Sequence, residues 1–140
     1  MNTIISMTLE ADVNYSRTVS FAAFNVAEAF ASLIGFCDNS AEYCHAYELA
    51  ISEAFTNSVR YAPPAQEKKS VTISFSQEGR RLIACVTDTN APFNPVTSAP
   101  DITSYPESGY GLYLIHSVMD SVSYKRENET NILSMSKLAE

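Results

Sequence analysis

The sequence lacks the long apolar segment that a membrane-spanning helix requires. Nowhere in its 140 residues is there an uninterrupted apolar run of about 18 or more. The N-terminus also lacks a basic region leading into a continuous apolar one, the pattern of a secretory signal. We therefore expect a soluble, cytoplasmic protein that is not inserted in a membrane.

Basic residues are scarce as well. The chain has 9 Lys and Arg against 16 Asp and Glu, and its formal net charge is -7. Proteins that bind nucleic acid usually present a basic surface to the phosphate backbone. The charge balance therefore argues against a nucleic-acid partner. A phosphate-bearing ligand would have to be held by a divalent cation and backbone N–H groups instead.

Cysteine is too sparse and too widely spaced for a structural role. Cys37, Cys44 and Cys85 are odd in number and include no C-x-x-C pair, and only His45 lies beside one of them. These features disfavour both a disulfide framework and a zinc site. We expect three reduced, half-buried thiols.

The length and composition fit one domain over residues 1–140. With 46% hydrophobic residues, the chain can bury a genuine core. Strands joined as hairpins, with helices gathered between them, predict a two-layer α+β sandwich: one mixed, mainly antiparallel sheet covered by three helices. The expected strands cover about residues 3–9, 71–75, 82–87, 121–126 and 130–137, and the expected helices about residues 12–33, 40–62 and 111–119.

Short polar signals mark the ends of the first two helices. Asp12 or Asn14 is expected to cap the first helix, and Gly35 to end it. Asn39, followed three residues later by Glu42, approximates a capping box for the second helix. The first strand alternates apolar residues with Ser and Thr, which predicts a half-buried strand.

The second helix carries an acid and an amide on one face of an otherwise apolar segment. In ELAISEAFTNSVRYA, residues 48–62, Glu53 and Asn57 stand four apart and so lie one above the other. Such a pair could hold Mg²⁺ with its waters, or a nucleophile and a phosphate, from one rigid platform. The same spacing is also typical of a plain solvated helix face.

Two later stretches contain further polar groups at the ends of elements. In CVTDTNAPFNP, Asp88 ends an apolar strand, and in ESGYGLYLIHSVMDSVSY, Gly109 and Gly111 precede a helix. Taken singly, the acid could be a turn residue and the glycines an ordinary turn. The proline-rich segment 89–108 between them predicts either a lid over a ligand or a disordered insertion.

The three stretches in this order resemble the histidine-kinase-like ATPase superfamily. The shared pattern is E-x-x-x-N on a helix, a strand followed by D-x-x-x-P-F, and G-x-G-L-x-L-I at a helix start. Within the superfamily, SEAFTNSVRYA, DTNAPFNP and GYGLYLIHSVMDSV are most similar to the bacterial anti-sigma-factor serine kinases. The resemblance extends from about the first helix to the C-terminus.

The resemblance implies ATP and Mg²⁺ as ligands and assigns roles to individual residues. Asn57 matches the Mg²⁺ ligand, Glu53 the proposed general base, and Asp88 the acid that accepts a hydrogen bond from the adenine amino group. Arg60 could face the phosphates or be an ordinary ion-paired arginine. Thr130 matches a threonine beside the adenine pocket, although a structural role in its Ser- and Thr-rich strand is equally open.

The glycine box and the strand-end box are expected to complete the nucleotide site. The family pattern implies that Gly109, Gly111 and Leu112 open the helix and bring backbone N–H groups to the phosphates. The chain departs from the pattern at Asn90, where a glycine is usual, and at Ser108, where a glycine is common. Asn tolerates a left-handed backbone, so we expect nucleotide binding to be weakened rather than lost.

The resemblance implies an ATP-dependent serine/threonine kinase that regulates transcription. Such a protein sequesters a sigma factor and phosphorylates a serine of an anti-anti-sigma (STAS-type) partner, and a homodimer is implied too. Arg17 lies where relatives contact partners, although a single arginine there is more often an ordinary surface residue. The alternatives are a non-catalytic partner-sequestering module and a stand-alone regulatory ATPase. A sensor histidine kinase would need a further helix pair carrying its phospho-acceptor, and we expect His116 to be a surface histidine or one with its hydrogen bonds satisfied inside the fold.

Overall fold

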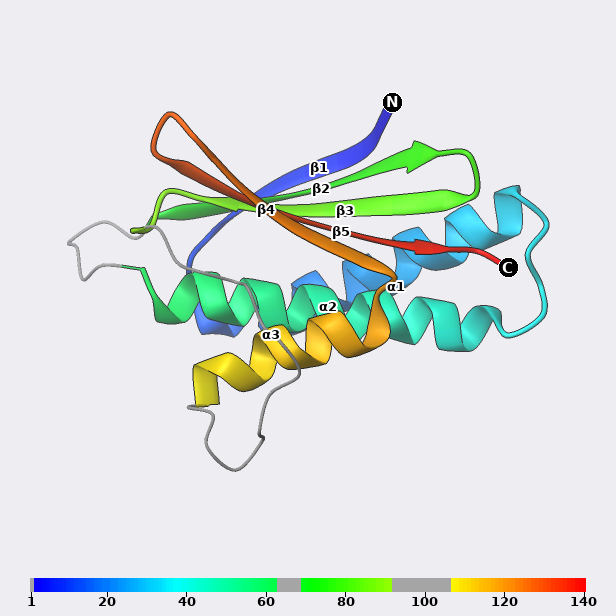
Figure 1. Ribbon diagram of the computed structural model, residues 1–140, viewed down its shortest axis with the longest axis horizontal. Coiled ribbons are helices and arrows are strands. Elements are labelled where there is room, and N and C mark those ends of the chain that lie inside the picture. The colour runs from blue at the N-terminus through cyan, green and yellow to red at the C-terminus, as the bar shows by residue number, and fades with distance from the viewer. Residues whose placement is uncertain (1, 63–68, 92–106) are drawn as a thin grey trace.

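A computed structural model describes residues 2–62, 69–91 and 107–140, and these residues form two layers. A five-stranded sheet makes one layer, and three helices lie together on one side of it (Figure 1). The strand order is β1-β2-β3-β5-β4. The strands are β1 Asn2–Glu10, β2 Ser70–Glu78, β3 Arg81–Asp88, β4 Ser121–Glu127 and β5 Thr130–Leu138, and the helices are α1 Ser16–Leu33, α2 Ser40–Arg60 and α3 Glu107–Val118. The α+β sandwich is therefore confirmed.

The sheet is antiparallel in all four of its ladders, so the mixed sheet expected from sequence is wrong in this detail. Two tight hairpins fix the register. Gly79, with φ +59, follows Glu78 in the turn between β2 and β3, while Asn128 and Glu129 both have positive φ between β4 and β5. Glu127 pairs with Thr130, so the second turn has two central residues, and their left-handed backbone suits the right-handed twist of a hairpin.

The helix ends follow the predicted positions but not all of the predicted contacts. Asp12 accepts a hydrogen bond from the Asn14 N–H at 2.9 Å, but this bond caps a single 3-10 turn, Val13–Tyr15, that precedes α1. The predicted cap of the first helix by Asp12 or Asn14 is therefore wrong, because α1 follows Tyr15, which makes no side-chain capping bond. Gly35 ends α1 with φ +75. The capping box at Asn39 is not formed: Asn39 has φ 60 and makes no side-chain capping bond, because a capping side chain works from an extended backbone.

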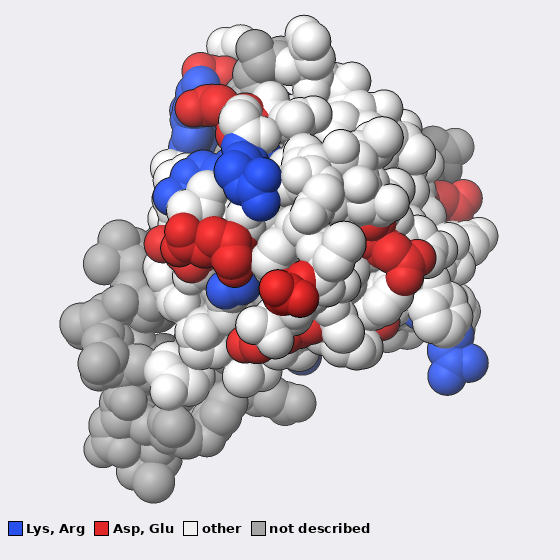
Figure 2. Space-filling model, turned by 90° about the vertical axis from the view of Figure 1, so that its right-hand side faces the viewer, with Lys and Arg blue, Asp and Glu red and all other residues white. Residues whose placement is uncertain are grey.

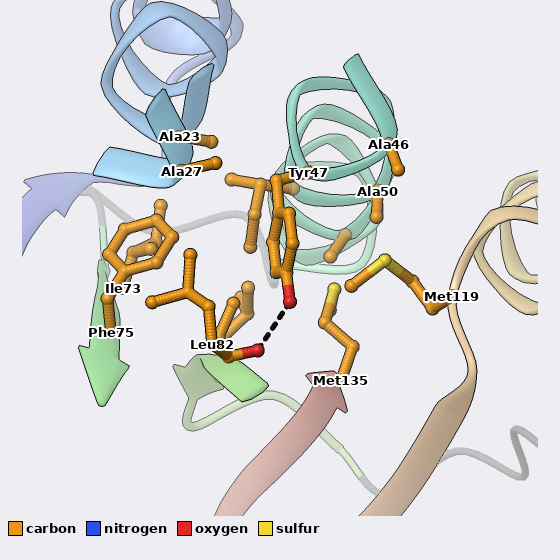
Figure 3. Close-up of a cluster of buried hydrophobic side chains, with 14 of the residues drawn as sticks. Ala23, Ala27, Ala46, Tyr47, Ala50, Ile73, Phe75, Leu82, Met119 and Met135 are labelled. Atoms are coloured by element: carbon orange, nitrogen blue, oxygen red, sulfur yellow. Dashed lines mark hydrogen bonds between the residues drawn. The ribbon is translucent and has the colours of Figure 1, made fainter. Parts of the chain in front are cut away.

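The core lies between the sheet and the helices, and Tyr47 is at its centre. Alanines of α1 and α2 allow the two helices to pack closely, and aliphatic side chains of β2, β3 and β5 fill the space below them (Figure 3). The Tyr47 hydroxyl donates to the Leu82 carbonyl and accepts from the Lys137 N–H at 3.0 Å. These bonds satisfy the one polar atom of a fully buried ring.

Two elements and two of the cysteines differ from their expected form. The helix predicted to begin at Gly111 begins at Glu107, so both glycines lie inside its first turns. The strand β1 is largely exposed rather than half-buried, because it lies at the sheet edge beyond the helices. Of the three thiols, all free, Cys37 is exposed, while Cys44 is buried and Cys85 half-buried.

The face shown in Figure 2 carries charged side chains of both signs. Blue and red groups lie close together, mainly toward one side of this view, and the described residues of this face form no continuous basic surface. Within residues 2–62, 69–91 and 107–140, none of the helices combines the length and the apolar character needed to cross a bilayer.

Candidate functional site

Glu53 and Asn57 meet the backbone of α3 at Gly111. Both side chains are half-buried on one face of α2, as their spacing predicted. A Cβ placed on Gly111 would lie 3.0 Å from Glu53 Oε2 and 3.1 Å from Asn57 Nδ2. Gly111 is therefore the point at which α3 approaches the acid and the amide, and only glycine leaves both side chains undisturbed there.

The start of α3 presents backbone donors near this pair. The first four N–H groups of an α-helix have no acceptor within the helix. In α3 these groups belong to residues 107–110, so Gly109 contributes such a donor, whereas Gly111 lies within the hydrogen-bonded turns. Leu112, the next residue, is half-buried and packs against the core, which fixes this end of the helix.

The remaining expected phosphate ligands are placed as follows. Arg60 is the last residue of α2 and is exposed, one turn beyond Asn57. The predicted lid, 89–108, falls mainly on residues 92–106, which lie outside the described residues, and so does the side chain of Ser108. His116 is exposed on α3, as expected of a surface histidine.

Asp88 ends β3 as a buried carboxylate surrounded by donors of the protein itself. Its Oδ2 accepts from the Ser58 hydroxyl at 2.7 Å. Its Oδ1 accepts from the Asn90 backbone N–H at 3.1 Å and from Asn131 Nδ2 at 2.8 Å. The carboxylate is 7% exposed, so these bonds replace most of its water. The network joins α2, β3 and β5.

Asn131 belongs to this network although nothing in the sequence motifs pointed to it. It is buried and lies directly opposite Asp88 in the β3–β5 ladder. Thr130, the residue expected beside the adenine pocket, is half-buried one position earlier and pairs with Glu127. The alternation of Asn131, Leu133 and Met135 along β5 is the signal that could have identified the amide as a core-facing group.

Asn90 has a structural function at the position where the family usually has glycine. Its Nδ2 donates to the Ser58 carbonyl at 2.8 Å, which satisfies one of the free carbonyls in the last turn of α2. Asn90 is not among the described non-glycine residues with positive φ, so the left-handed backbone considered for it does not occur. The Asn90 side chain instead ties the end of β3 to α2.

The arrangement suits a divalent cation held between protein and phosphate. The described residues contain no cluster of three or more His, Cys, Asp or Glu side chains. One carboxylate and one amide oxygen on the same helix face fit Mg²⁺, which keeps several waters and takes further oxygens from phosphates. Glu53 and Asn57 could therefore hold Mg²⁺ in the presence of a phosphate ligand. Asp88, at the end of β3, presents a hydrogen-bond acceptor beside Ser58 of the same helix.

Comparison with known proteins finds a matching family and several relatives. The histidine kinase-like ATPase domain family matches residues 12–137. Among curated proteins, the serine-protein kinase RsbW of Bacillus mycoides is 29% identical over 138 residues, covering 92% of this chain and 81% of the relative. The RsbW serine-protein kinase of Listeria innocua is 30% identical over 131 residues, covering 87% and 79%.

Solved structures share the fold. The RsbU and RsbW domains of Rv1364c from Mycobacterium tuberculosis match 99% of this chain with a TM-score of 0.64 at 16% identity, and the match spans 32% of that longer chain. The Acinetobacter baumannii histidine kinase AdeS matches 96% of this chain and 68% of its own, with a TM-score of 0.52 at 14% identity. The chain belongs to the histidine-kinase-like ATPase family.

Proposed function

We propose that the chain is an anti-sigma-factor serine/threonine kinase, a transferase that uses ATP and Mg²⁺. In this proposal it sequesters a sigma factor and phosphorylates a serine of a STAS-type anti-anti-sigma protein. The observation that carries the proposal is the meeting of Glu53 and Asn57 with Gly111, because it brings an acid, a metal-ligand amide and a helix start together. The similarity to serine-protein kinases named RsbW supports it.

Each group at this meeting point has a task in phosphoryl transfer. The metal, when bound, neutralises charge on the phosphates, and Asn57 would be its protein ligand. The first N–H groups of α3, including that of Gly109, would donate to phosphate oxygens, and Arg60 would face the phosphates. Glu53 would accept the proton of the incoming serine hydroxyl as its oxygen bonds to the γ-phosphorus and ADP leaves.

The base of the nucleotide would lie at the Asp88 end of the site. Asp88 would accept a hydrogen bond from the adenine amino group, with Asn90, Leu112 and Thr130 beside the same pocket. This assignment is supported by the burial of Asp88 at the strand end, where its carboxylate is fixed by Ser58. The partners proposed act on RNA polymerase, so the proposal implies transcription regulation in the cytoplasm.

The kinase reaction can be tested on Glu53 alone. Purified wild-type protein and Glu53→Gln would be incubated with radiolabelled ATP, Mg²⁺ and each STAS-type protein encoded in the same genome. We expect one acceptor to be labelled on serine, and the variant to be slower by about 100-fold or more while still binding ATP. Glu28→Gln, an exposed glutamate of α1, is the matched control. Equal labelling by Glu53→Gln would contradict the catalytic assignment.

The edge strand β1 supports assembly with a second copy. Residues 2–9 carry no charged side chain, and Ile4 and Ile5 are 50% and 39% exposed. The other edge strand, β4, carries Lys125 and Glu127, which discourage pairing. We therefore propose a homodimer formed through β1. Ile5→Lys should convert it to a monomer in light-scattering measurements, and a variant that remains dimeric would exclude this edge.

A second function, a partner-sequestering module without catalysis, is favoured by the Asp88 network. Asp88 already accepts hydrogen bonds from three donors of the protein, and the Asn90 side chain donates to the Ser58 carbonyl of α2. This end of the site therefore keeps its hydrogen bonds without a nucleotide. A protein that holds its partner equally well with and without ATP, and labels no acceptor, would favour this alternative over the kinase.

A further inference from the structure

Three donors from the described residues reach the Asp88 carboxylate, which leaves one acceptor position for a ligand. An ionised carboxylate offers about four acceptor positions, two on each oxygen. Both positions on Oδ1 are taken, by the Asn90 N–H at 3.1 Å and by Asn131 Nδ2 at 2.8 Å. On Oδ2 the Ser58 hydroxyl takes one, at 2.7 Å. A ligand at this site can therefore donate one hydrogen bond to Asp88, through Oδ2.

The orientation of the Asn131 amide is dictated by its other neighbours. Its Oδ1 accepts from Arg126 Nη1 at 2.8 Å and from the Tyr124 hydroxyl at 2.5 Å. A guanidinium has only donors, so the atom that faces Arg126 must be the amide oxygen, and the NH₂ group must face Asp88. Asn131 cannot turn its oxygen toward the carboxylate without losing both bonds.

Arg126 holds both of the groups that fill Oδ1. The same Nη1 that binds Asn131 also donates to the Asn90 carbonyl at 3.1 Å. The Asn90 carbonyl in turn accepts from Asn131 Nδ2 at 2.9 Å. Arg126 comes from β4, the edge strand beyond β5, and only the end of its side chain reaches the network. Removal of the Arg126 side chain should therefore weaken the hydrogen bonds that Asp88 Oδ1 accepts, without creating a cavity in the core.

The number of free acceptor positions discriminates between purine bases. Adenine presents one exocyclic amino group beside a ring acceptor, and one free position on Oδ2 satisfies it. Guanine presents two adjacent donors, N1–H and N2–H, which pair with a carboxylate through both of its oxygens. With Oδ1 occupied, one guanine donor would be buried without a partner, which weakens binding by about 10-fold to 100-fold.

We propose that Asn131, held by Arg126, is the residue that makes this site selective for adenine over guanine nucleotides. The inference rests on the proposed function, because it requires a nucleotide base beside Asp88. Asn131 acts through Asp88 and does not itself touch the base. It is therefore a positioning residue, and its effect should be visible in the ratio of two affinities rather than in either affinity alone.

The test is the ratio of the dissociation constants for GTP and ATP, each measured with Mg²⁺ by calorimetry. The wild-type protein should bind ATP at least about 10-fold more tightly than GTP. In Asn131→Ala the ratio should fall toward one, because Oδ1 becomes free to accept the second guanine donor. Arg126→Met, which lies outside the core, should lower the ratio in the same direction. Asn25→Ala, an exposed asparagine of α1, should leave it unchanged.

The possible results separate this inference from the function on which it rests. A wild-type protein that binds both nucleotides equally would overturn the inference and leave the proposed function intact. The inference would also be overturned if both variants lowered the affinities for ATP and GTP by the same factor, because a purely structural role would have this effect. A wild-type protein that binds neither nucleotide would overturn both. Thermal unfolding of each variant identifies one that fails to fold, and Arg126→Met then decides alone.

Discussion

Gly111 and Glu53 are in such close contact that a methyl group on the glycine would lie 3.0 Å from the Glu53 Oε2 atom. The contact joins the second and third helices at the centre of the proposed phosphate site. It also explains why the second glycine of the sequence motif falls inside α3 rather than before it. A helix turn without a side chain is what allows an acid and an amide to face α3 directly.

Gly111→Ala should separate function from stability. The atoms that the new methyl group meets are the ends of Glu53 and Asn57, which can move, and alanine favours a helix by about 1 kcal/mol over glycine. We expect the free energy of unfolding to change by less than about 1 kcal/mol, while Mg²⁺–ATP affinity and phosphorylation fall about 10-fold or more. Calorimetry and acceptor labelling measure the two effects. His116→Ala on the exposed side of α3 is the control, and an active Gly111→Ala protein would refute the placement.

Removal of Mg²⁺ should abolish the stabilisation that ATP provides. A ligand at about a hundred times its dissociation constant stabilises a folded protein by about 2.7 kcal/mol, which raises the melting temperature by several degrees. We expect this shift for wild-type protein with Mg²⁺ and ATP, and its loss with a chelator or in Asn57→Ala. Asn25→Ala should keep the shift. An Asn57→Ala protein stabilised as strongly as wild type would exclude Asn57 as a metal ligand.

Asp88→Asn should destabilise the fold even without nucleotide. An amide NH₂ placed among the donors of Ser58, Asn90 and Asn131 leaves at least one buried donor without an acceptor. We expect a loss of about 1–3 kcal/mol in the free energy of unfolding, measured by urea denaturation. Asp38→Asn, at an exposed position before α2, should change it little. Equal stability of wild type and Asp88→Asn would mean that the network contributes nothing to folding.

Glu129→Gly should stabilise the protein. Glu129 has φ 64 in the β4–β5 turn, a left-handed backbone that a side chain with a Cβ adopts at a cost. Glycine removes that cost but loses more entropy on folding, so the expected gain is about 0.5–1 kcal/mol. Asn128→Ala in the same turn should have the opposite sign, because asparagine tolerates its φ of 49 better than alanine. Urea denaturation of the two variants checks both signs, and a destabilised Glu129→Gly protein would be inconsistent with a strained turn.

Stability should decrease above pH 10 because of Tyr47. Burial raises the pKa of Tyr47 far above the ordinary value of 10.0. The unfolded chain then ionises this phenol near pH 10, while the folded protein keeps it neutral. The contribution of Tyr47 to the free energy of unfolding is therefore complete below pH 10 and is lost as the pH rises above 10, by about 1.4 kcal/mol per pH unit. Tyr47→Phe should lower stability at pH 7 but flatten this alkaline slope. An exposed tyrosine variant, Tyr61→Phe, should leave the slope unchanged.

Part of the site was predictable because it depends on local geometry. A helix fixes residues four apart on one face, so Glu53 and Asn57 could be paired from the sequence, and a strand ending at Asp88 followed from alternation. The role of Asn131 could not be read in the same way. Its contact with Asp88 crosses 43 positions of sequence and depends on which strands are neighbours in the sheet.

The order of strands and helices, the two-layer class and the positions of both hairpins follow from the sequence alone, because they depend on periodicity and turn residues within short segments. The start of α3, the exposure of β1 and the surroundings of Asp88 depend on the folded chain. Each of these is set by packing between distant segments: α3 against α2, β1 at an uncovered edge, and β5 beside β3. Local propensity carries no information on such contacts, because residues that are distant in the sequence meet and stabilise each other only in the folded chain.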